Sequence, residues 1–340
     1  MNKLKIGHFV LMILSVVSMS YNGIAAADDH ATLKGINFPG PAIAGHVYPG
    51  TINKNYHFPS ATDVKTYAES GFDMIRLAIT WERLQPELGQ PFATDYLRRV
   101  QDFVQEAAKH DLRVVIDVHN YGKYKGQLIG TDAVTTEDFE KLWYGLAEHF
   151  RDDRHVLFGL MNEPNKQDAM TWSVIAQEAV NAIREANASQ TILVPATFYS
   201  SAARWLHKDG YYSNGEALKK IDDPKNNMVF EAHQYLDKYS TGTEADCVSA
   251  DIGVQRLTAF TGWLKENGYK GFLGEFAAGA SETCQQALKN MLDYIEANEE
   301  VWYGWTYWVA DPWFRDYIFN IYPPDPQQFP QVGILKQFIN

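Results

Sequence analysis

Two glutamates stand directly after short apolar runs and could act together as a pair of carboxyl groups. The sequence around them reads Leu160-Met161-Asn162-Glu163-Pro164 and Phe272-Leu273-Gly274-Glu275-Phe276. Cleavage of a glycosidic bond needs two such groups beside the bond, one protonated to assist the leaving oxygen and one ionised. Mutual repulsion and partial loss of water separate their pKa values and so allow this division of roles. The pair therefore indicates acid–base chemistry on a sugar linkage.

Paired carboxylates can also hold a divalent cation, so a metal site is the alternative. Such sites need further oxygen or nitrogen ligands nearby. A third ligand at close spacing is missing from the sequence around Glu163 and Glu275. We therefore expect no metal and no cofactor.

The elements that must position these groups are visible as a repeating pattern of apolar runs and amphipathic stretches. Eight apolar runs bounded by turn residues predict strands. They are Leu33–Phe38, Phe72–Ile79, Leu112–His119, His155–Asn162, Thr191–Thr197, Met228–Tyr235, Lys270–Phe276 and Val301–Trp308. Helices are predicted over Ser60–Ser70, Asp95–Lys109, Thr136–Phe150, Asp168–Ala186, Val254–Glu266 and Glu282–Asn298, with a poorly defined one within Ser201–Ile221.

Regular alternation of strand and helix over eight units predicts an α/β fold with one parallel sheet wrapped by helices. A closed (β/α)8 TIM barrel uses all eight units in one catalytic domain. An open doubly wound sheet is the alternative, but the Gly-rich nucleotide-binding turn expected after an early strand is absent. We therefore favour the barrel.

Polar residues gather at the carboxyl ends of the predicted strands, where barrel enzymes carry their reacting groups. The strand ends supply Asn37, Arg76, Asp117, His119, Asn120, Asn162, Glu163, His233, Tyr235, Glu275 and Trp308. Glu163 and Glu275 end the fourth and seventh strands, so they face one another across the mouth of a barrel. A purely structural protein would not need this set of residues in one place.

This ordered set resembles glycoside hydrolase family five, and within it the secreted endo-β-1,4-glucanases. Further stretches carry the likeness, namely Glu82-Arg83-Leu84-Gln85-Pro86, Gln234-Tyr235-Leu236-Asp237 and Ala310-Asp311-Pro312-Trp313. The resemblance implies a retaining mechanism with Glu163 as general acid and base and Glu275 as nucleophile. Retention corresponds to carboxyl groups about 5 to 5.5 Å apart.

The resemblance also implies roles for the neighbouring side chains. Arg76 and Tyr235 would hold Glu275 ionised through charge-assisted hydrogen bonds. Asn162 would bond the sugar 2-hydroxyl, His119 other hydroxyls, and His233 the Glu163 carboxyl. Taken alone, either histidine would more often be a satisfied core residue.

Aromatic residues make up 14% of the chain and supply flat surfaces for sugar rings. We expect Trp308 to form the floor of the sugar site. Alternation along the last strand places Trp302, Gly304, Thr306 and Trp308 on one face, although Trp302 and Trp305 are expected in the core. Further substrate contacts are expected from Asn37, Asn120, Tyr121, Trp205, Asp237 and Trp313, with Trp81 and Tyr199 as weaker candidates.

Composition and charge exclude several classes of partner. The 340 residues are 46% hydrophobic and 21% charged, as in ordinary folded proteins, and the net charge is −12. This charge disfavours nucleic acid and anionic membrane surfaces. A neutral or cationic substrate, here a β-glucan, and a monomeric protein are expected.

The amino terminus has the pattern of a secretory signal peptide. Lys3 and Lys5 precede an apolar run from Phe9 to Met19, and Ala25-Ala26-Ala27 follows. We expect a signal peptide over 1–27, a catalytic domain over 28–340, and a secreted or periplasmic protein. No later segment approaches the ~20 apolar residues of a membrane span.

The two cysteines of the chain, Cys247 and Cys284, both lie in the part expected to be exported. An oxidising compartment allows them to pair, so we expect a disulfide. A reactive or metal-bound thiol is the alternative, and no Cys or His stands near either residue at ligand spacing.

The substrate is the least determined property. A mannanase, mixed-linkage glucanase or xyloglucanase could use the same catalytic frame, and a non-catalytic glycan-binding barrel is the alternative outside enzymes. Where related glucanases carry an acidic residue, the loop after Asn37 reads Phe38-Pro39-Gly40-Pro41-Ala42. No linker marks off a binding module, which favours soluble or amorphous glucan over crystalline cellulose.

Overall fold

The computed structural model describes residues 32–208 and 210–339. The predicted signal peptide at 1–27 lies outside the described residues. Within them, no helix is both long enough and apolar enough to cross a membrane.

Eight parallel strands close into a barrel, as predicted, and an open sheet is excluded. Around the barrel the order is β1, β2, β3, β6, β7, β8, β9 and β10, and β10 pairs with β1 to close the ring. The strands span Leu33–Phe38, Met74–Ile79, Arg113–Val118, Val156–Gly159, Ile192–Pro195, Met228–His233, Gly271–Phe276 and Trp302–Tyr307. Each strand lies within its predicted run. Several strands end before the run does, because the polar residues at the end of the run belong to the loops at the mouth of the barrel.

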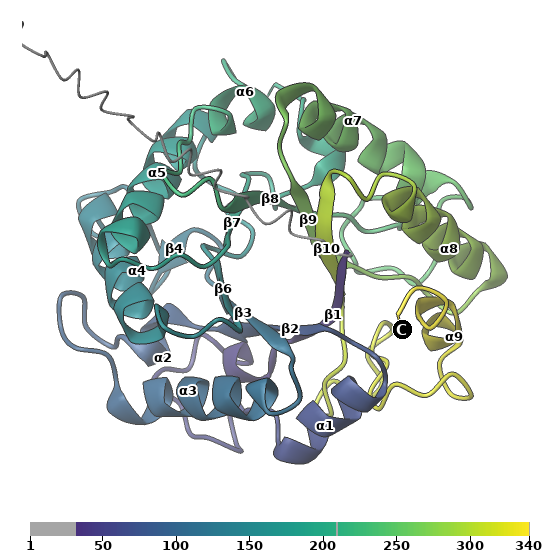
Figure 1. The fold of residues 1–340 in the computed structure, drawn as a ribbon, viewed down its shortest axis with the longest axis horizontal. Coiled ribbons are helices and arrows are strands. Elements are labelled where there is room, and N and C mark those ends of the chain that lie inside the picture. The colour runs from purple at the N-terminus through teal and green to yellow at the C-terminus, as the bar shows by residue number, and fades with distance from the viewer. Residues whose placement is uncertain (1–31, 209, 340) are drawn as a thin grey trace, which may run out of the picture. The chain divides into compact units, whose positions relative to one another are not determined.

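Helices ring the strands (Figure 1). The larger ones are α1 Ala61–Glu69, α3 Thr94–Ala108, α4 Thr136–Phe150, α5 Ala169–Glu185, α7 Ile252–Asn267 and α8 Glu282–Glu296. Local capping sets several starts: the hydroxyls of Ser60 and Thr135 each accept a hydrogen bond from the backbone NH three residues later in a capping box. Gly268, with φ 70°, ends α7 in the left-handed conformation that favours glycine.

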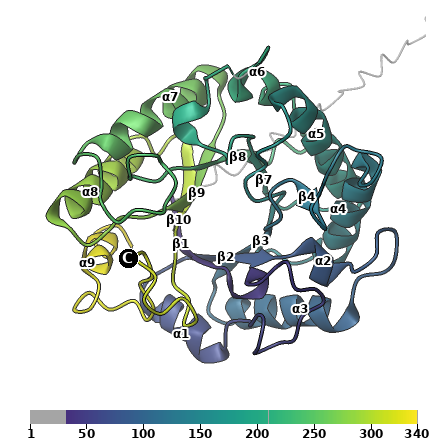
Figure 2. The same cartoon turned by 180° about the vertical axis from the view of Figure 1, so that it is seen from behind.

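Smaller elements occupy the loops and were not predicted. They are η1 Gly40–Ala42, α2 Trp81–Leu84, β4 Lys123–Tyr124, β5 Gln127–Leu128, η2 Ala202–Arg204 and α9 Pro330–Leu335. The poorly defined fifth helix is the five-residue α6, Asn214–Leu218. Seen from behind, α9 lies beside α8 next to the end of the chain (Figure 2).

The barrel interior has an apolar layer and a charged layer. Leu33, Met74, Val115, Leu157, Leu193, Val229 and Phe272 form one buried cluster at the amino ends of the strands. Two residues further along their strands stand Arg76, Asp117 and Glu231, each fully buried. Alternation along each strand turns both layers inward, so the charged layer lies directly beneath the mouth.

A register shift in β10 changes which tryptophans share a face. The pairing with β9 slips between Trp302 and Gly304. Trp302 therefore packs outward against Phe260 of α7, with ring centroids 5.5 Å apart, while Tyr303 contacts the inner cluster. The expectation that Trp302 shares a face with Trp308 is wrong because a local bulge breaks the alternation. Both Trp302 and Trp305 are buried in the core, as expected.

Candidate active site

Glu163 and Glu275 meet at the mouth of the barrel. Glu163 follows β6 on a left-handed backbone with φ 45°, and Glu275 lies in β9. One carboxylate oxygen of each and one ring nitrogen of His233 all lie within 4.8 Å of one another. Strained backbone of this kind is frequent where a side chain must be aimed at a reacting centre.

A bulge in β9 aims Glu275 toward the mouth. Ala232 pairs with Leu273, but the next residue, His233, pairs with Glu275, so β9 contains one extra residue at this point. Gly274 is the inserted residue, and a Cβ there would lie 2.0 Å from Glu231 Oε1. Only glycine fits between the bulge and the buried carboxylate.

Arg76 connects the buried charges beneath the pair. Its NH1 donates to Glu275 Oε1 at 3.2 Å, and its NH2 and Nε lie 3.2 and 3.0 Å from carboxylate oxygens of Asp117 and Glu231. Burial by itself would lower the pKa of Arg76, but the three carboxylates outweigh burial and raise it. The guanidinium is a permanent cation that holds Glu275 in place.

Tyr235 completes the environment of Glu275. Its hydroxyl donates to Glu275 Oε2 at 2.7 Å. Burial, followed by the charge of Glu275, raises the pKa of Tyr235 well above its usual value, so the phenol stays protonated as a donor. Both oxygens of Glu275 thus have a donor.

Glu163 has a different environment, which suits a proton donor. Burial raises its pKa, and the charge of Glu275 adds to this effect, while the hydrogen bond with His233 acts in the opposite direction. His233 Nδ1 lies 2.8 Å from Glu163 Oε1, and its Nε2 lies 3.2 Å from Glu231 Oε1. The environments of the two carboxyl groups therefore differ, as a division into acid and nucleophile requires.

His233 is a cation in this arrangement. Burial by itself would lower its pKa, but the charge of Glu275 and the hydrogen bonds with the two other carboxylates raise the pKa to about 10. Glu163, His233 and Glu275 have ligand atoms close enough to surround a metal ion. A protonated imidazole with both nitrogens bonded to carboxylates offers no lone pair, so this set does not fit a metal.

Asn162 and His119 extend the network toward the sugar floor. Asn162 Oδ1 accepts from Arg76 NH2 at 2.9 Å, and its Nδ2 lies 3.2 Å from His119 Nε2. His119 Nδ1 is 2.7 Å from Asp117 Oδ2, which fixes the ring. The imidazole is parallel to the Trp308 indole, with centroids 5.9 Å apart.

Two hollows flank the carboxyl pair. The first, about 720 Å³, is lined by His119, Asn120, Tyr121 and Trp308 together with Tyr48, Glu82, Lys123, Lys125 and Phe314. The second, about 610 Å³, is lined by Glu163, His233 and Tyr235 together with Tyr199, Arg204, Lys238, Tyr239 and Arg256. The mouth is therefore open on both sides of the pair.

Several expected substrate contacts are wrong because their side chains are enclosed. Trp205 is fully buried against Phe230, Phe260 and Trp263, and Trp81 is likewise buried. Amphipathic spacing cannot distinguish such a core ring from an exposed one.

Two polar residues also fail as direct contacts. Asn37 is 1% exposed: its Nδ2 donates to the Gly274 carbonyl at 2.8 Å, and its Oδ1 accepts from Arg76. Asp237 is 2% exposed and accepts hydrogen bonds from Thr241. These two residues brace the site and do not face a substrate.

The remaining candidates lie in the loops that follow β3 and β10. Asn120 lines the first hollow, but its side chain accepts from Trp81 N and donates to Glu82. Tyr121 lines the same hollow. Trp313 is 38% exposed and stacks on His57, with centroids 4.3 Å apart.

Sequence reasoning missed several lining residues, among them Tyr48, Lys123, Phe314, Lys238, Tyr239 and Arg256. Arg256 lies in α7, and the others belong to loops or short loop elements with no regular pattern. For the loop residues, the one signal was a position after a predicted strand.

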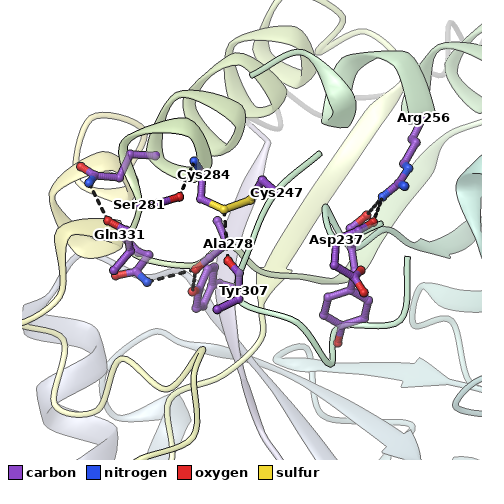
Figure 3. Close-up of a disulfide and its surroundings, with 12 residues drawn as sticks. Asp237, Cys247, Arg256, Ala278, Ser281, Cys284, Tyr307 and Gln331 are labelled. Atoms are coloured by element: carbon purple, nitrogen blue, oxygen red, sulfur yellow. Dashed lines mark hydrogen bonds between the residues drawn. A yellow bond between two sulfur atoms is a disulfide. The ribbon is translucent and has the colours of Figure 1, made fainter. Parts of the chain in front are cut away.

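The predicted disulfide joins Cys247 and Cys284, with Cα atoms 5.2 Å apart (Figure 3). It ties the loop after β8 to the first turn of α8. Arg256, in α7, also holds this loop: its NH1 donates to the carbonyls of Tyr235 and Asp237 at 2.6 and 2.8 Å. The loop that follows Tyr235 is thus held at both ends.

Known proteins share this architecture and sequence. A probable endo-beta-1,4-glucanase B of Neosartorya fischeri is 34% identical over 98% of both chains, and endo-beta-1,4-glucanase B of Emericella nidulans is 35% identical over 86% of this chain and 87% of its own. The structure of XacCel5A in complex with cellopentaose superposes with a TM-score of 0.88 at 42% identity, covering 90% of this chain and 99% of that one. Pseudomonas stutzeri endoglucanase Cel5A in complex with cellobiose gives 0.83 at 32%, covering 91% and 92%. Residues 31–311 match the family model of cellulase (glycosyl hydrolase family 5), and the chain belongs to that family.

Proposed function

We propose that this protein is a retaining endo-β-1,4-glucanase in which Glu163 is the acid and base and Glu275 is the nucleophile. The observation that carries the mechanism is the approach of the two carboxyl groups, which have one oxygen each within 4.8 Å. That spacing leaves no room for the water that an inverting enzyme places between its carboxyl groups. Relatives named endo-beta-1,4-glucanases span nearly the whole chain.

In the first step Glu275 Oε attacks the anomeric carbon of the bound sugar. A bond forms between that carbon and the carboxylate oxygen as the bond to the glycosidic oxygen breaks. Glu163 donates its proton to the leaving oxygen, which departs as a free hydroxyl on the other half of the chain. The raised pKa of Glu163 keeps this proton available.

In the second step water resolves the glycosyl-enzyme. Glu163, now ionised, takes a proton from water, whose oxygen bonds to the anomeric carbon. The bond to Glu275 breaks and its carboxylate returns to Arg76 and Tyr235. Two inversions give net retention, and both glutamates are restored to their starting states.

The supporting residues position the sugar and the two glutamates for these steps. Asn162 Nδ2 lies 3.2 Å from His119 Nε2 within the network beside the sugar floor, and Trp308 presents an indole face on which C–H groups of a pyranose ring can pack. His233 keeps Glu163 oriented. Tyr235 and Arg76 hold the Glu275 carboxylate before it attacks.

The open mouth supports cleavage within a chain. Hollows on both sides of the carboxyl pair allow a polymer to extend in either direction. The solved relatives include complexes with cellopentaose and with cellobiose, and β-1,4-glucan is accordingly the substrate. Soluble or amorphous glucan is the form we propose.

We also propose that the protein is exported and monomeric. The amino-terminal pattern over 1–27 supports secretion or transport to the periplasm, with 28–340 as the catalytic domain. The Cys247–Cys284 disulfide is the kind of cross-link that persists in an oxidising compartment.

Release of reducing ends by the purified protein tests the function. Carboxymethylcellulose, barley β-glucan, mannan and xylan are compared, with Glu275→Gln as the blank and Glu282→Gln, on the exposed first turn of α8, as the matched control. Rapid release from the two glucans, lost only in Glu275→Gln, is expected. Stronger release from mannan would replace the substrate, and sugar binding without any release would contradict the enzyme assignment.

A further inference from the structure

The second hollow carries an excess of basic side chains on its walls. Arg204, Lys238 and Arg256 line it, and Glu163 is the one acidic residue among its lining residues. We call this hollow the leaving-group pocket, because Glu163, which protonates the departing oxygen, lines it and does not line the first hollow. The sugars that leave in the first step therefore occupy this side.

Lys238 projects into this region without a carboxylate partner. It is exposed, its Nζ lies 5.2 Å from the centroid of the Tyr239 ring, and it forms no ion pair with any carboxylate in the described part of the chain. The acidic residues of its loop do not line the pocket; they are Asp237, Glu244, Asp246 and Asp251. Its positive charge is consequently available to a ligand.

Arg256 adds a second cation that backbone groups hold in place. Besides the two bonds from NH1, its NH2 lies 3.4 Å from the Lys238 carbonyl. Asp237 is the nearby acid, and its carboxylate is already bonded to Thr241 and the Gly242 NH. Three carbonyl partners satisfy only part of the donor set of a guanidinium, which has five N–H groups.

Glu163 does not cancel these charges. Its pKa is raised by burial, and the cationic His233 lies 2.8 Å away. The pocket is therefore positive when the enzyme is ready for its first step, although the chain carries −12 overall. Net charge governs long-range approach, whereas a ligand in the pocket responds to the side chains beside it.

We propose that the leaving-group pocket accepts a carboxylate carried by the polysaccharide, such as a carboxymethyl or uronic acid substituent on the departing sugars. Tyr199 and Tyr239 offer rings beside the sugars, and Lys238 pairs with the substituent. The inference rests on the proposed glucanase function and extends it to acidic substituted glucans.

The test compares an anionic with a neutral polymer in matched variants. kcat/KM is measured on carboxymethylcellulose and on hydroxyethylcellulose for wild type, Lys238→Gln and Lys238→Glu, at low and high ionic strength. Lys225→Gln is the control, because it removes the same charge from an exposed turn before β8, at the opposite end of the barrel.

We compare the ratio of kcat/KM on carboxymethylcellulose to kcat/KM on hydroxyethylcellulose. We expect Lys238→Gln to lower this ratio roughly two- to five-fold at low salt, the range of an exposed ion pair. Lys238→Glu lowers it further, and high salt removes most of the difference. An unchanged ratio, or an equal change in Lys225→Gln, would overturn the proposal. Absence of wild-type activity on both polymers would instead contradict the glucanase function itself.

Discussion

The Tyr235 hydroxyl donates to Glu275 Oε2 at 2.7 Å, from a ring that is packed against two neighbours. Gly242 approaches so closely that a Cβ would lie 2.6 Å from the ring, and the Phe319 ring stacks on it with centroids 6.3 Å apart. The donor is therefore fixed before substrate arrives. Preorganised donors of this kind do not have to reorient during the reaction.

Removing that hydroxyl tests the contribution of the donor. Tyr235→Phe keeps the packing but removes the hydrogen bond to Glu275 Oε2 while that from Arg76 remains. We therefore expect kcat/KM to fall roughly 10- to 100-fold, the range for hydrogen bonds to charged groups. Tyr307→Phe is the control, since its hydroxyl donates to the Ala278 carbonyl at 3.4 Å. Equal effects in the two variants would remove the special role of Tyr235.

The two glutamates can be told apart by the leaving group. Glu163→Gln lacks the proton donor, so we expect a loss of about 10²- to 10⁴-fold on glucan and a much smaller loss in glycosylation of a dinitrophenyl cellobioside, whose leaving group needs no protonation. Glu275→Gln lacks the nucleophile and should lose about 10³-fold or more on both. Pre-steady-state release of dinitrophenol measures this step. Similar losses on both substrates for Glu163→Gln would contradict the assigned roles.

The pH profile of kcat/KM should follow the protonation of Glu163. Activity requires the protonated form of Glu163. Because the pKa of Glu163 is raised, activity should persist at pH values above the usual pKa of a glutamic acid and fall only at higher pH. His233 lowers that pKa, and His233→Asn should therefore move the basic limb to higher pH. His149→Asn, at an exposed position of α4, should leave the limb in place. A shift to lower pH in His233→Asn would show that another group controls the limb.

Stability should depend on pH through His233. Its pKa rises from 6.5 to about 10 on folding, so its contribution is fully present below pH 6.5 and is lost as pH rises through about 10. The difference in free energy of unfolding between wild type and His233→Asn should therefore shrink from pH 6.5 to 10. Urea unfolding across this range measures it. A constant difference would mean that His233 is not a buried cation.

The disulfide should stabilise the fold without setting specificity. It closes a loop of 37 residues, and its loss costs about 4 kcal/mol in the chain-entropy model. The variant Cys247→Ser with Cys284→Ser should melt several degrees lower, while the relative rates on β-glucan and carboxymethylcellulose change little. An unchanged melting temperature under oxidising conditions would contradict this account.

The sequence by itself determined the strands and the residues at their ends. Each barrel strand lies within its apolar run, and Glu163, His233, Tyr235 and Glu275 stand at or directly after the ends of those runs. Hydrophobic periodicity is a local property, and closure of a parallel barrel places the carboxyl ends of all strands together. The residues around the mouth of the barrel can therefore be predicted from the sequence before the geometry is known.

Only the tertiary structure decided which of these residues can touch a substrate. Trp205 and Trp308 have equally plausible positions in the sequence, yet one is enclosed by three aromatic rings and the other lines the mouth. Likewise Asn37 turned out to brace Arg76, and bulges in β9 and β10 changed the faces that alternation predicts. Exposure and register depend on contacts between residues far apart in the chain, and a local pattern carries no information about them.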